Sequence, residues 1–475
     1  MPASFLHGVE TITLSQNTRP ISVVRTAVIA LVGIAPKGDK NVLKLVSSID
    51  DAAKFGSPLP GFNIPKALEI IFSYGAGTVL VVNTFDSTTN TAQVTAESKT
   101  VTNAKFKLAF APIGAVTLTN VGATVTYVKD TDYSIDDFGN VVLLPGSAMI
   151  EAQNILATYK KLDASTVNSA QIVGSVDVVT EVRTGMKLFF TAYNTFGVKP
   201  KIMIAPGFSN VSGVVTELAS QALKFRAIYL LDAPAGTTVA GAITARGPAG
   251  TVAGWNTSNN RAMLLYPMIK TYDKATATDA NTPYSMLMAG LLAWNDNQNG
   301  YWFSPSNKEL LPATGIERSI TADISDATSE ANRLNEVGII TVFTSYGTGI
   351  RSWGNRSASW PSSTTPDNFI CVQRTFDIVA DSVELASLQF IDQPISQALI
   401  DAIVETVNSF IRTLIGRGAL IEGSKAYFDE SKNPSTELAA GHLTISRKLM
   451  APTPAERITY EDDIDINLLN NVIPQ

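Results

Sequence analysis

The chain has 475 residues and a formal net charge of −6, and 16% of its residues are charged. This charged fraction is well below the roughly 25% of ordinary soluble domains, and interface cores are depleted of charge in the same way, so the composition favours a subunit of a large assembly over a freely diffusing enzyme. The acidic balance and the lack of a run of Lys and Arg argue against a nucleic-acid partner.

An extended arm is expected at the N-terminus, residues 1–20. Residues 10–15 alternate in the manner of a strand, which places Glu10, Ile12 and Leu14 on one side of the chain. Pro20 separates this segment from the first strongly apolar run. The pattern therefore predicts a strand that stands apart from the core.

A core of alternating strands and helices is predicted for residues 21–87 and 169–365. Residues 27–33 form a continuous apolar run, typical of a strand covered on both faces, and Pro65 opens a helix that leads to a strand at residues 78–82. Further helices are predicted at residues 184–196, 211–225, 240–246, 283–294 and 330–336, and further strands at residues 202–205, 227–231, 262–266 and 339–343. Such repeats build a mainly parallel sheet with helices on its faces, so the predicted fold class is α/β.

A small all-β domain is predicted between the two parts of the core, at residues 88–168. Thr, Val, Asn and Asp dominate this stretch, and its strand signals, such as residues 115–119 and 123–127, are short. Residues 136–140 carry a strong turn signal. The stretch begins just after a strand, where an inserted domain disturbs the sheet least.

An α+β domain is predicted at residues 366–450. Residues 394–415 have the clearest helical periodicity in the chain, and strands are expected at residues 419–421 and 444–447. A helix of this kind is more often a core helix than a docking helix. Its polar face would nevertheless carry four side chains outward, available to a partner: Asp401, Glu405, Asn408 and Arg412.

The C-terminal arm, residues 451–475, has the pattern of a strand without a partner of its own. Beyond two prolines, alternation places four apolar side chains on one side: Ile458, Tyr460, Ile464 and Ile466. A terminal strand must pair with an existing sheet edge, which can belong to its own domain or to another molecule. With an extended arm at each end, the chain is organised for linking copies of itself.

Candidate catalytic and metal-binding residues are few. His7 and His442 are the only histidines and Cys371 is the only cysteine, so neither a zinc-ligand cluster nor an internal disulfide is expected. The densest acidic group, at residues 462–465, is split between two faces of the predicted strand. No Gly-x-Ser-x-Gly motif is present, and His442 would be the one realistic base for a triad. We therefore expect no catalytic residue, no metal and no cofactor.

Residues 347–354 are the best candidate for a phosphate-binding loop, but they lack the sixth-position glycine of the dinucleotide fingerprint and the Gly-Lys-Ser/Thr of a P-loop. A turn in a structural loop is the favoured interpretation. An aromatic and basic group follows, and it could stack on a sugar or base, although packing against a neighbouring domain is favoured: Arg351, Trp353, Arg356 and Trp360. The sequence has neither a signal-peptide pattern nor an apolar run of membrane-spanning length, so we expect no cleaved export signal and no membrane insertion.

Four stretches give the chain a resemblance to a known family. They are Phe-Leu-His-Gly-Val-Glu at residues 5–10, Val-Ile-Ala-Leu-Val-Gly-Ile-Ala-Pro at residues 28–36, Gly-Ile-Arg-Ser-Trp-Gly-Asn-Arg at residues 349–356 and Ala-Pro-Thr-Pro-Ala-Glu-Arg-Ile at residues 451–458. With these stretches, of which the last two are the more specific, the chain resembles the sheath proteins of contractile-tailed phages and of R-type bacteriocins. The resemblance covers essentially the whole chain except the all-β insertion.

The resemblance implies a structural subunit that forms a helical homo-oligomer of stacked rings around an inner tail tube protein, with baseplate and tail terminator proteins as further partners. It implies that both arms add strands to the C-terminal sheets of neighbouring copies, that the C-terminal domain faces the tube, and that contraction drives the tube through a cell envelope. The expected location is the tail sheath of a virion, assembled in the cytoplasm of the bacterial host. A surface adhesin or carbohydrate-binding protein is the alternative; it would explain the low charge and the Thr-rich insertion, but not two arms.

Overall fold

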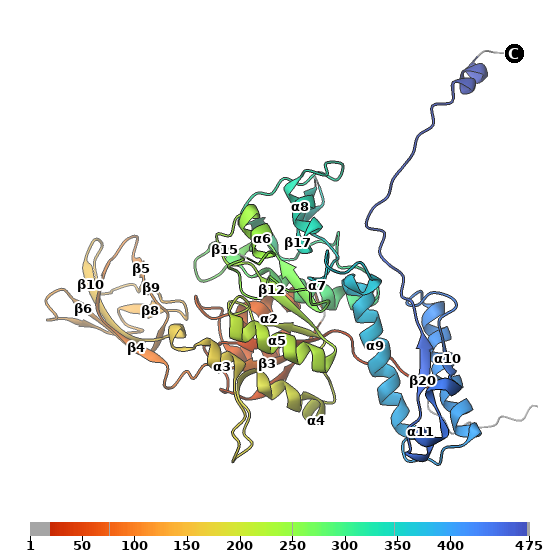
Figure 1. The fold of residues 1–475 in the computed structure, drawn as a ribbon. Helices are drawn as coiled ribbons and strands as arrows, with labels where there is room; N and C mark the ends of the chain where they lie inside the picture. Colours follow the sequence, from red (N-terminus) through yellow and green to blue (C-terminus); the bar gives the residue numbers. More distant parts are fainter. Residues whose placement is uncertain (1–19, 76, 249, 346, 473–475) are drawn as a thin grey trace, which may run out of the picture.

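The computed structural model describes residues 20–472 apart from residues 76, 249 and 346. Its centre is an eight-stranded sheet in the order β18-β17-β13-β12-β11-β1-β3-β2 (Figure 1). The strands are β1 Val28–Gly33, β2 Leu43–Val46, β3 Thr78–Asn83, β11 Ile202–Ile204, β12 Ile228–Asp232, β13 Ala262–Leu265, β17 Ile339–Ser345 and β18 Gly349–Trp353. The inner strands pair in parallel, and β2 and β18 are antiparallel at the two edges. The predicted α/β class with a mainly parallel sheet is confirmed.

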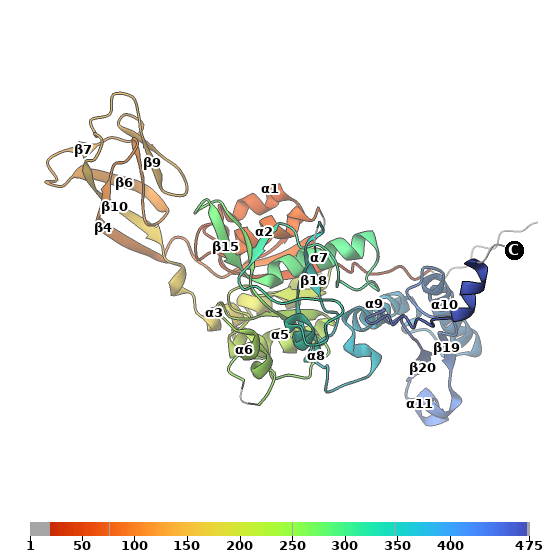
Figure 2. The same cartoon turned by 90° about the horizontal axis from the view of Figure 1, so that it is seen from above.

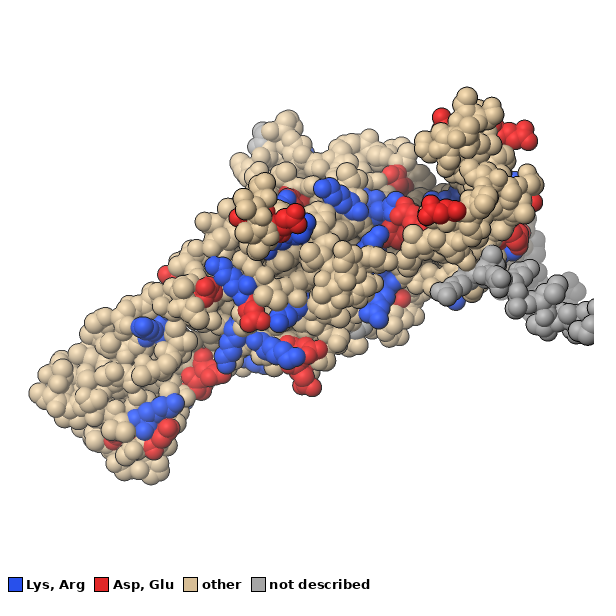
Figure 3. Space-filling model, turned by 90° about the horizontal axis from the view of Figure 1, so that it is seen from below, with Lys and Arg blue, Asp and Glu red and all other residues tan. Residues whose placement is uncertain are grey.

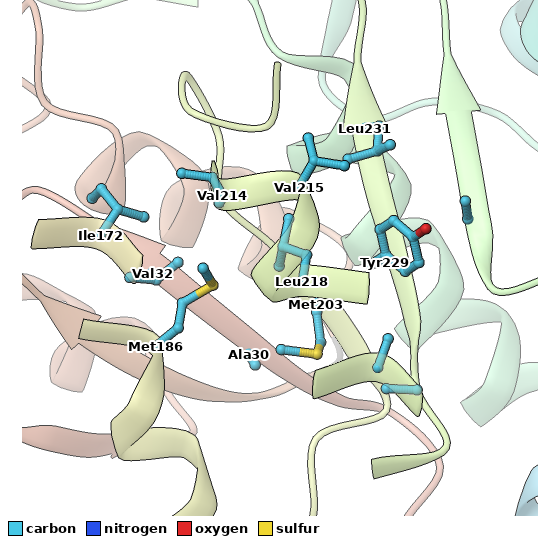
Figure 4. Packing of buried hydrophobic residues seen from close by; sticks show 14 of the residues in the cluster. Ala30, Val32, Ile172, Met186, Met203, Val214, Val215, Leu218, Tyr229 and Leu231 are labelled. Carbon is cyan, nitrogen blue, oxygen red and sulfur yellow. The ribbon is translucent and has the colours of Figure 1, made fainter. Parts of the chain in front are cut away.

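Helices cover both faces of this sheet, and the side chains of β1 alternate between them. Ala30 and Val32 join the cluster that includes α5 (Ser212–Phe225), whereas Ile29 and Leu31 join the cluster that includes α2 (Ile64–Ser73) and α7 (Tyr284–Gln298). Figure 4 shows the first cluster, in which Val214, Val215 and Leu218 of α5 lie among the strand residues Met203, Tyr229 and Leu231. All of β1 is therefore buried, which explains its unbroken apolar sequence. The remaining core helices are α1 Ile49–Ala52, α3 Ser169–Val173, α4 Ala192–Phe196, α6 Val239–Ala245 and α8 Glu330–Glu336.

The helix predicted at residues 184–196 is only partly α-helical. Gly185–Thr191 is a 3₁₀ helix, and the α-helix is confined to Ala192–Phe196. Side chains three residues apart eclipse one another in a 3₁₀ helix. That period suits this segment, because Met186, Phe189 and Ala192 are all buried in the α5 cluster.

The predicted all-β stretch forms two small antiparallel sheets around a hydrophobic cluster of its own, which stands at one end of the molecule (Figure 2). We call it the β unit. Its strands are β4 Thr91–Thr100, β5 Lys105–Lys107, β6 Pro112–Asn120, β7 Thr126–Tyr127, β8 Tyr133–Ile135, β9 Asn140–Leu143 and β10 Asn154–Leu162. The strand predicted at residues 123–127 is shortened to β7, since Ala123 has a positive φ of 51° that a strand does not accommodate. A third small sheet, β15-β14-β16, lies against the core and consists of β14 Ile269–Asp273, β15 Thr278–Thr282 and β16 Ala313–Ile316.

Another unit, which we call the C-terminal unit, lies at the opposite end (Figure 2). It contains α9 Ile370–Ser387, α10 Gln397–Gly416, α11 Ser435–Ala439 and the two-stranded sheet of β19 Lys425–Phe428 and β20 Ile445–Lys448. The strand predicted at residues 419–421 is wrong, because the Ala419 N–H bonds back to the carbonyl of Leu414 and this segment forms the C-terminal cap of α10. Helix α9 is not among the predicted elements. The exact limits of the predicted domains stay a prediction.

Buried ion pairs attach α9 to the core. Arg374 donates two hydrogen bonds to Asp296 at the end of α7, at 2.7 and 2.6 Å, and Arg261 pairs in the same way with Asp377. Asp381 accepts from Lys201 and Arg226. The Lys201–Asp381 and Arg374–Asp296 pairs are all but inaccessible to water. Elsewhere charge is sparse: Figure 3 shows broad uncharged areas between small groups of acidic and basic side chains.

Candidate subunit-linking site

Both ends of the described chain are rooted in the C-terminal unit. Ile21 and Val23 pack against its hydrophobic cluster, and the Val24 N–H donates to the hydroxyl of Ser382 in α9 at 3.2 Å. Ala451, at the other end, is fully buried in the same cluster. Two segments that are distant in sequence therefore pack into one hydrophobic cluster of the C-terminal unit.

The C-terminal arm is anchored at its start by one side chain. Arg356 donates to the carboxylate of Glu456, with its Nε 3.0 Å from Oε1, and it also bonds Asn368 and lies over the rings of Trp360 and Phe369. The favoured interpretation of the aromatic and basic group, packing within the protein, is confirmed for Arg356. The same contact holds the arm to the body only as far as Glu456.

Beyond this anchor the arm carries an uncovered apolar stripe. Residues 457–465 contain no helix or strand, and Figure 1 shows them running away from the body. The four predicted stripe residues are 67%, 85%, 88% and 73% exposed: Ile458, Tyr460, Ile464 and Ile466. Ile466 begins a short 3₁₀ helix, Ile466–Val472, so the extended part ends one residue earlier than the alternation suggested. Pairing of this segment as a strand stays a prediction. The N-terminal candidates Glu10, Ile12 and Leu14 lie outside the described residues.

The sheet of β19 and β20 has one closed edge and one open edge. The side-chain amide of Asn408 accepts from the Ala426 N–H at 2.8 Å and donates to the Ala426 carbonyl at 2.9 Å, as a neighbouring strand would. Ala426 is thus bonded on the side away from β20, so Ala426 and its partner Arg447 form a pair without mutual hydrogen bonds. The N–H and C=O of Arg447 then point away from β19, and the open edge belongs to β20.

A groove of about 370 Å³ lies against β20. Ile445 and Arg447 of β20 line it together with residues of α9, α10 and the segment that joins these helices. Its apolar lining residues are Val383, Phe390, Ile391, Ile395, Leu399, Ile403, Val407, Leu443 and Ile445. An open strand edge beside an apolar groove has the features of a site for an added strand, because the edge supplies backbone hydrogen bonds and the groove supplies pockets for alternate side chains.

Three of the four side chains proposed to face a partner from α10 are free to do so. Asp401, Glu405 and Arg412 are exposed, and Arg412 pairs with Glu405. The amide of Asn408 is instead committed to the backbone of β19. Contact of this helix face with a tube is a prediction that no observation tests.

The carboxyl ends of the parallel strands, where α/β enzymes usually bind ligands, are occupied by structural contacts. Asp232 at the end of β12 accepts hydrogen bonds from the Ser285 N–H at 2.7 Å, the Ser285 hydroxyl at 2.6 Å and the Ser209 hydroxyl at 3.0 Å. Burial raises the pKa of Asp232 above its usual value. Pro283 provides no side-chain cap for α7, and Asp232 provides one instead. The sequence does not single out this group, because each of its three residues is unremarkable alone.

The remaining candidates for chemistry also have structural roles. Residues 349–353 of the proposed phosphate loop form the edge strand β18, paired with β17, and Trp353 stacks on Phe343. His442 is exposed beside Glu437, and burial raises the pKa of Cys371 to about 11. Among the described residues, no group of His, Cys, Asp and Glu is suited to holding a metal ion, and no helix is long and apolar enough to cross a membrane.

Comparison with known proteins gives one consistent result. A model for the phage tail sheath protein central domain matches residues 181–358, and a model for the phage tail sheath C-terminal domain matches residues 362–464. A tail sheath protein of Burkholderia phage BcepMu is 45% identical over 468 residues, which cover 98% of each chain. The tail sheath protein of Escherichia phage P2 is 30% identical over 310 residues, 65% of this chain and 74% of the relative.

Two solved structures share the fold at low sequence identity. The sheath complex of an extracellular contractile injection system, PVC, in its contracted state has 15% identity and a TM-score of 0.62, with coverage of 98% of this chain and 100% of that one. The helical sheath of the anti-feeding prophage, also contracted, has 15% identity and a TM-score of 0.58 with the same coverage. At this identity the likeness concerns the fold alone.

Proposed function

Because the chain belongs to the phage tail sheath protein family, it is a structural subunit of a tail sheath, and we propose that its copies polymerise helically by adding terminal strands to one another. One observation carries the proposal: the same chain has an uncovered apolar stripe on its C-terminal arm and an open strand edge beside an apolar groove. The arm has an apolar stripe without a covering surface, and the edge of β20 with its groove offers such a surface and free backbone hydrogen-bonding groups.

The strand is expected to be added between copies and not within one chain. The arm leaves the body at the Arg356–Glu456 ion pair and runs away from the C-terminal unit, and so away from β20 (Figure 1). Its acidic residues, Glu461, Asp462, Asp463 and Asp465, complement Arg447 and Lys448 of β20. An arm that reaches from one copy to the next makes a heterologous contact, and such contacts propagate as a filament when the rotation does not close a ring.

The proposal extends to the complete tail. The C-terminal unit would face an inner tube protein, with Asp401, Glu405 and Arg412 as candidate contacts, and baseplate and tail terminator proteins would bound the sheath. Contraction would change the contacts between bodies while the arms stay paired, and it would drive the tube through a cell envelope. Such a change between two packings needs no nucleotide. Assembly is expected in the cytoplasm of the bacterial host.

Truncation before Ala455 tests the role of the arm. The shortened chain keeps the buried Ala451, so we expect a folded protein that forms no tubes in electron micrographs and sediments as a monomer. Tubes formed as readily as by the full chain would overturn the proposal.

A substitution on β20 tests the acceptor edge. Arg447→Pro removes a backbone N–H that points away from β19, and proline is tolerated at such edge positions, so the fold should be kept while strand addition is blocked. Arg447→Ala is the matched control, since it removes the side chain and keeps the N–H. We expect tubes from Arg447→Ala and none from Arg447→Pro; equal assembly by both folded variants would exclude β20 as the acceptor.

A further inference from the structure

A narrow hairpin at residues 174–185 projects from the core below α3 (Figure 1). Two glycines with positive φ form its base. A Cβ on Gly174 would lie 1.9 Å from the carbonyl oxygen of Thr184, and a Cβ on Gly185 would lie 2.6 Å from that of Gln171. The two limbs thus enter and leave the core at a spacing that only glycine permits.

The hairpin is held in shape by its own hydrogen bonds. The Asp177 N–H donates to the carbonyl of Val182 at 2.9 Å, and the Thr184 N–H donates to the carbonyl of Ser175 at 2.9 Å. At the tip, the carboxylate of Asp177 accepts from the N–H groups of Val179 at 2.9 Å and Thr180 at 2.7 Å. These bonds hold the pKa of Asp177 below its usual value, and the bond from Thr180 has the largest effect. The tip is therefore shaped before any partner arrives, which reduces the entropy lost on binding.

The tip presents apolar side chains to solvent. Val178 is 94% exposed and Val179 is 92% exposed, and Val182 on the returning limb is more than half exposed. Isolated exposed valines are common on protein surfaces. Adjacent valines at the end of a shaped projection, which contribute nothing to their own core, are better explained by a contact with another molecule.

The chemistry of the hairpin favours a protein surface as the partner. Asp177 and Glu181 flank the valines, and Arg183 supplies the one positive charge of the limbs. This acidic balance does not suit nucleic acid or an anionic lipid surface, and the tip lacks the aromatic residues typical of membrane interfaces. With nucleic acid and membrane surfaces disfavoured, we expect the two valines to be buried in an apolar recess of a protein.

The position of the hairpin favours a second copy of this chain, and not the tube protein, as the binding partner. The molecule is elongated from the β unit through the core to the C-terminal unit, and the hairpin leaves the middle of this length at a steep angle to it (Figure 1). The C-terminal arm leaves toward the opposite side (Figure 1). If the C-terminal unit faces the tube, as in the proposed function on which this step rests, the hairpin lies at the radius of the neighbouring cores and beyond reach of the tube.

We propose that the hairpin at residues 174–185 is a second linking element, which inserts Val178 and Val179 into the core of the neighbouring copy on the side opposite to the C-terminal arm. Each subunit then holds one neighbour through its arm and another through its hairpin. The arm contact is a flexible strand, whereas the hairpin contact is a rigid projection.

Thiol labelling of tubes tests this proposal directly. Cys371 is buried with a raised pKa, so Val178→Cys introduces the one reactive thiol expected among the described residues. In the free chain Cys at this position should react rapidly with a maleimide, and in tubes formed from this chain alone it should react at least about tenfold more slowly, as burial requires. Val121→Cys, on an exposed turn of the β unit, is the matched control and should react rapidly in both states.

The other outcomes are separable. Equal labelling of position 178 in free chain and tubes would overturn the hairpin contact, and protection that appears only when tube protein is present would assign the hairpin to the tube instead. A wild-type chain that forms no tubes would refute the proposed function, and the hairpin contact with it. As a second variant, Val178→Asp with Val179→Asp should unfold at the wild-type temperature yet raise the concentration needed for assembly about tenfold or more, and Val121→Asp should leave it unchanged.

Discussion

The two ends of the molecule are attached to the core in different ways. The C-terminal unit is joined by α9, whose Arg374, Asp377 and Asp381 form ion pairs with residues of the core, two of them fully enclosed. The β unit is joined through two chain segments, through the packing of Leu162 at the end of β10 on the core cluster, and through a few polar contacts such as a bond from Lys107 to the Ala275 carbonyl. Under the proposed function the C-terminal unit passes the movement of its neighbours to the core, and the first kind of junction suits that task.

The largest expected effect is on the α9 junction. Arg374→Ala leaves the carboxylate of Asp296 buried and without its partner, and loss of one member of such a pair costs about 3–5 kcal/mol of unfolding free energy. Chemical denaturation measures this loss. The control is Arg412→Ala. Arg412 also pairs with a carboxylate, that of Glu405, but this pair is exposed, so the unfolding free energy should change by no more than about 0.5 kcal/mol. Similar losses for both variants would contradict the distinction between buried and exposed pairs.

A smaller effect is expected from the pH dependence of the same junction. Burial of Asp381 favours its neutral form, but Lys201 and Arg226 outweigh burial and hold its pKa below the usual value. A carboxyl whose folded pKa is depressed stabilises the fold above its unfolded pKa, near 4, and this contribution is lost as the pH falls through the folded value. Asp381→Asn should therefore cost roughly 1.5–3 kcal/mol at pH 7, and the difference from wild type should shrink toward pH 3. Denaturation at both pH values measures it, and a difference that grows on acidification would contradict this account.

The sequence predicts the central sheet well because burial on both faces leaves a direct record. Residues 28–33 are all apolar because every one of them is covered. Helix α9 carries an apolar row at helical spacing, Val372, Phe376, Val379 and Val383, which packs in the cluster of the C-terminal unit. Its other side carries Arg374, Asp377 and Asp381, and these charges have the appearance of a solvated face until their partners in the core are located. Hydrophobic periodicity can therefore reveal the helix, but it cannot show that the charged side is packed against the core.

The sequence points to the arm of the proposed linking site but not to the proposed acceptor. Ile458 and Tyr460 are exposed as an unpaired stripe, in agreement with their alternation. Asn408 has the sequence pattern of a surface residue on α10, but it closes the edge of β19, and this role depends on a backbone segment 18 residues further along the chain. Identification of the open edge on β20 required the three-dimensional register of β19 and β20.

The smallest effect is expected at the other junction. The Asp163 N–H donates to the carbonyl of Asn90 at 2.9 Å, so the two segments that lead into the β unit lie side by side at the surface of the core. Replacement of residues 91–161 by a short Gly-Ser link removes a unit with its own hydrophobic cluster and keeps Leu162, which packs on the core. Because the link closes only a small loop, the unfolding free energy of the core should change by about 1 kcal/mol or less. Denaturation and electron microscopy of this variant should show a stable core that still forms tubes. Loss of the core fold would mean that the β unit is as integral as α9, and the contrast between the two junctions would fail; a folded core without tubes would instead place an assembly contact on the β unit.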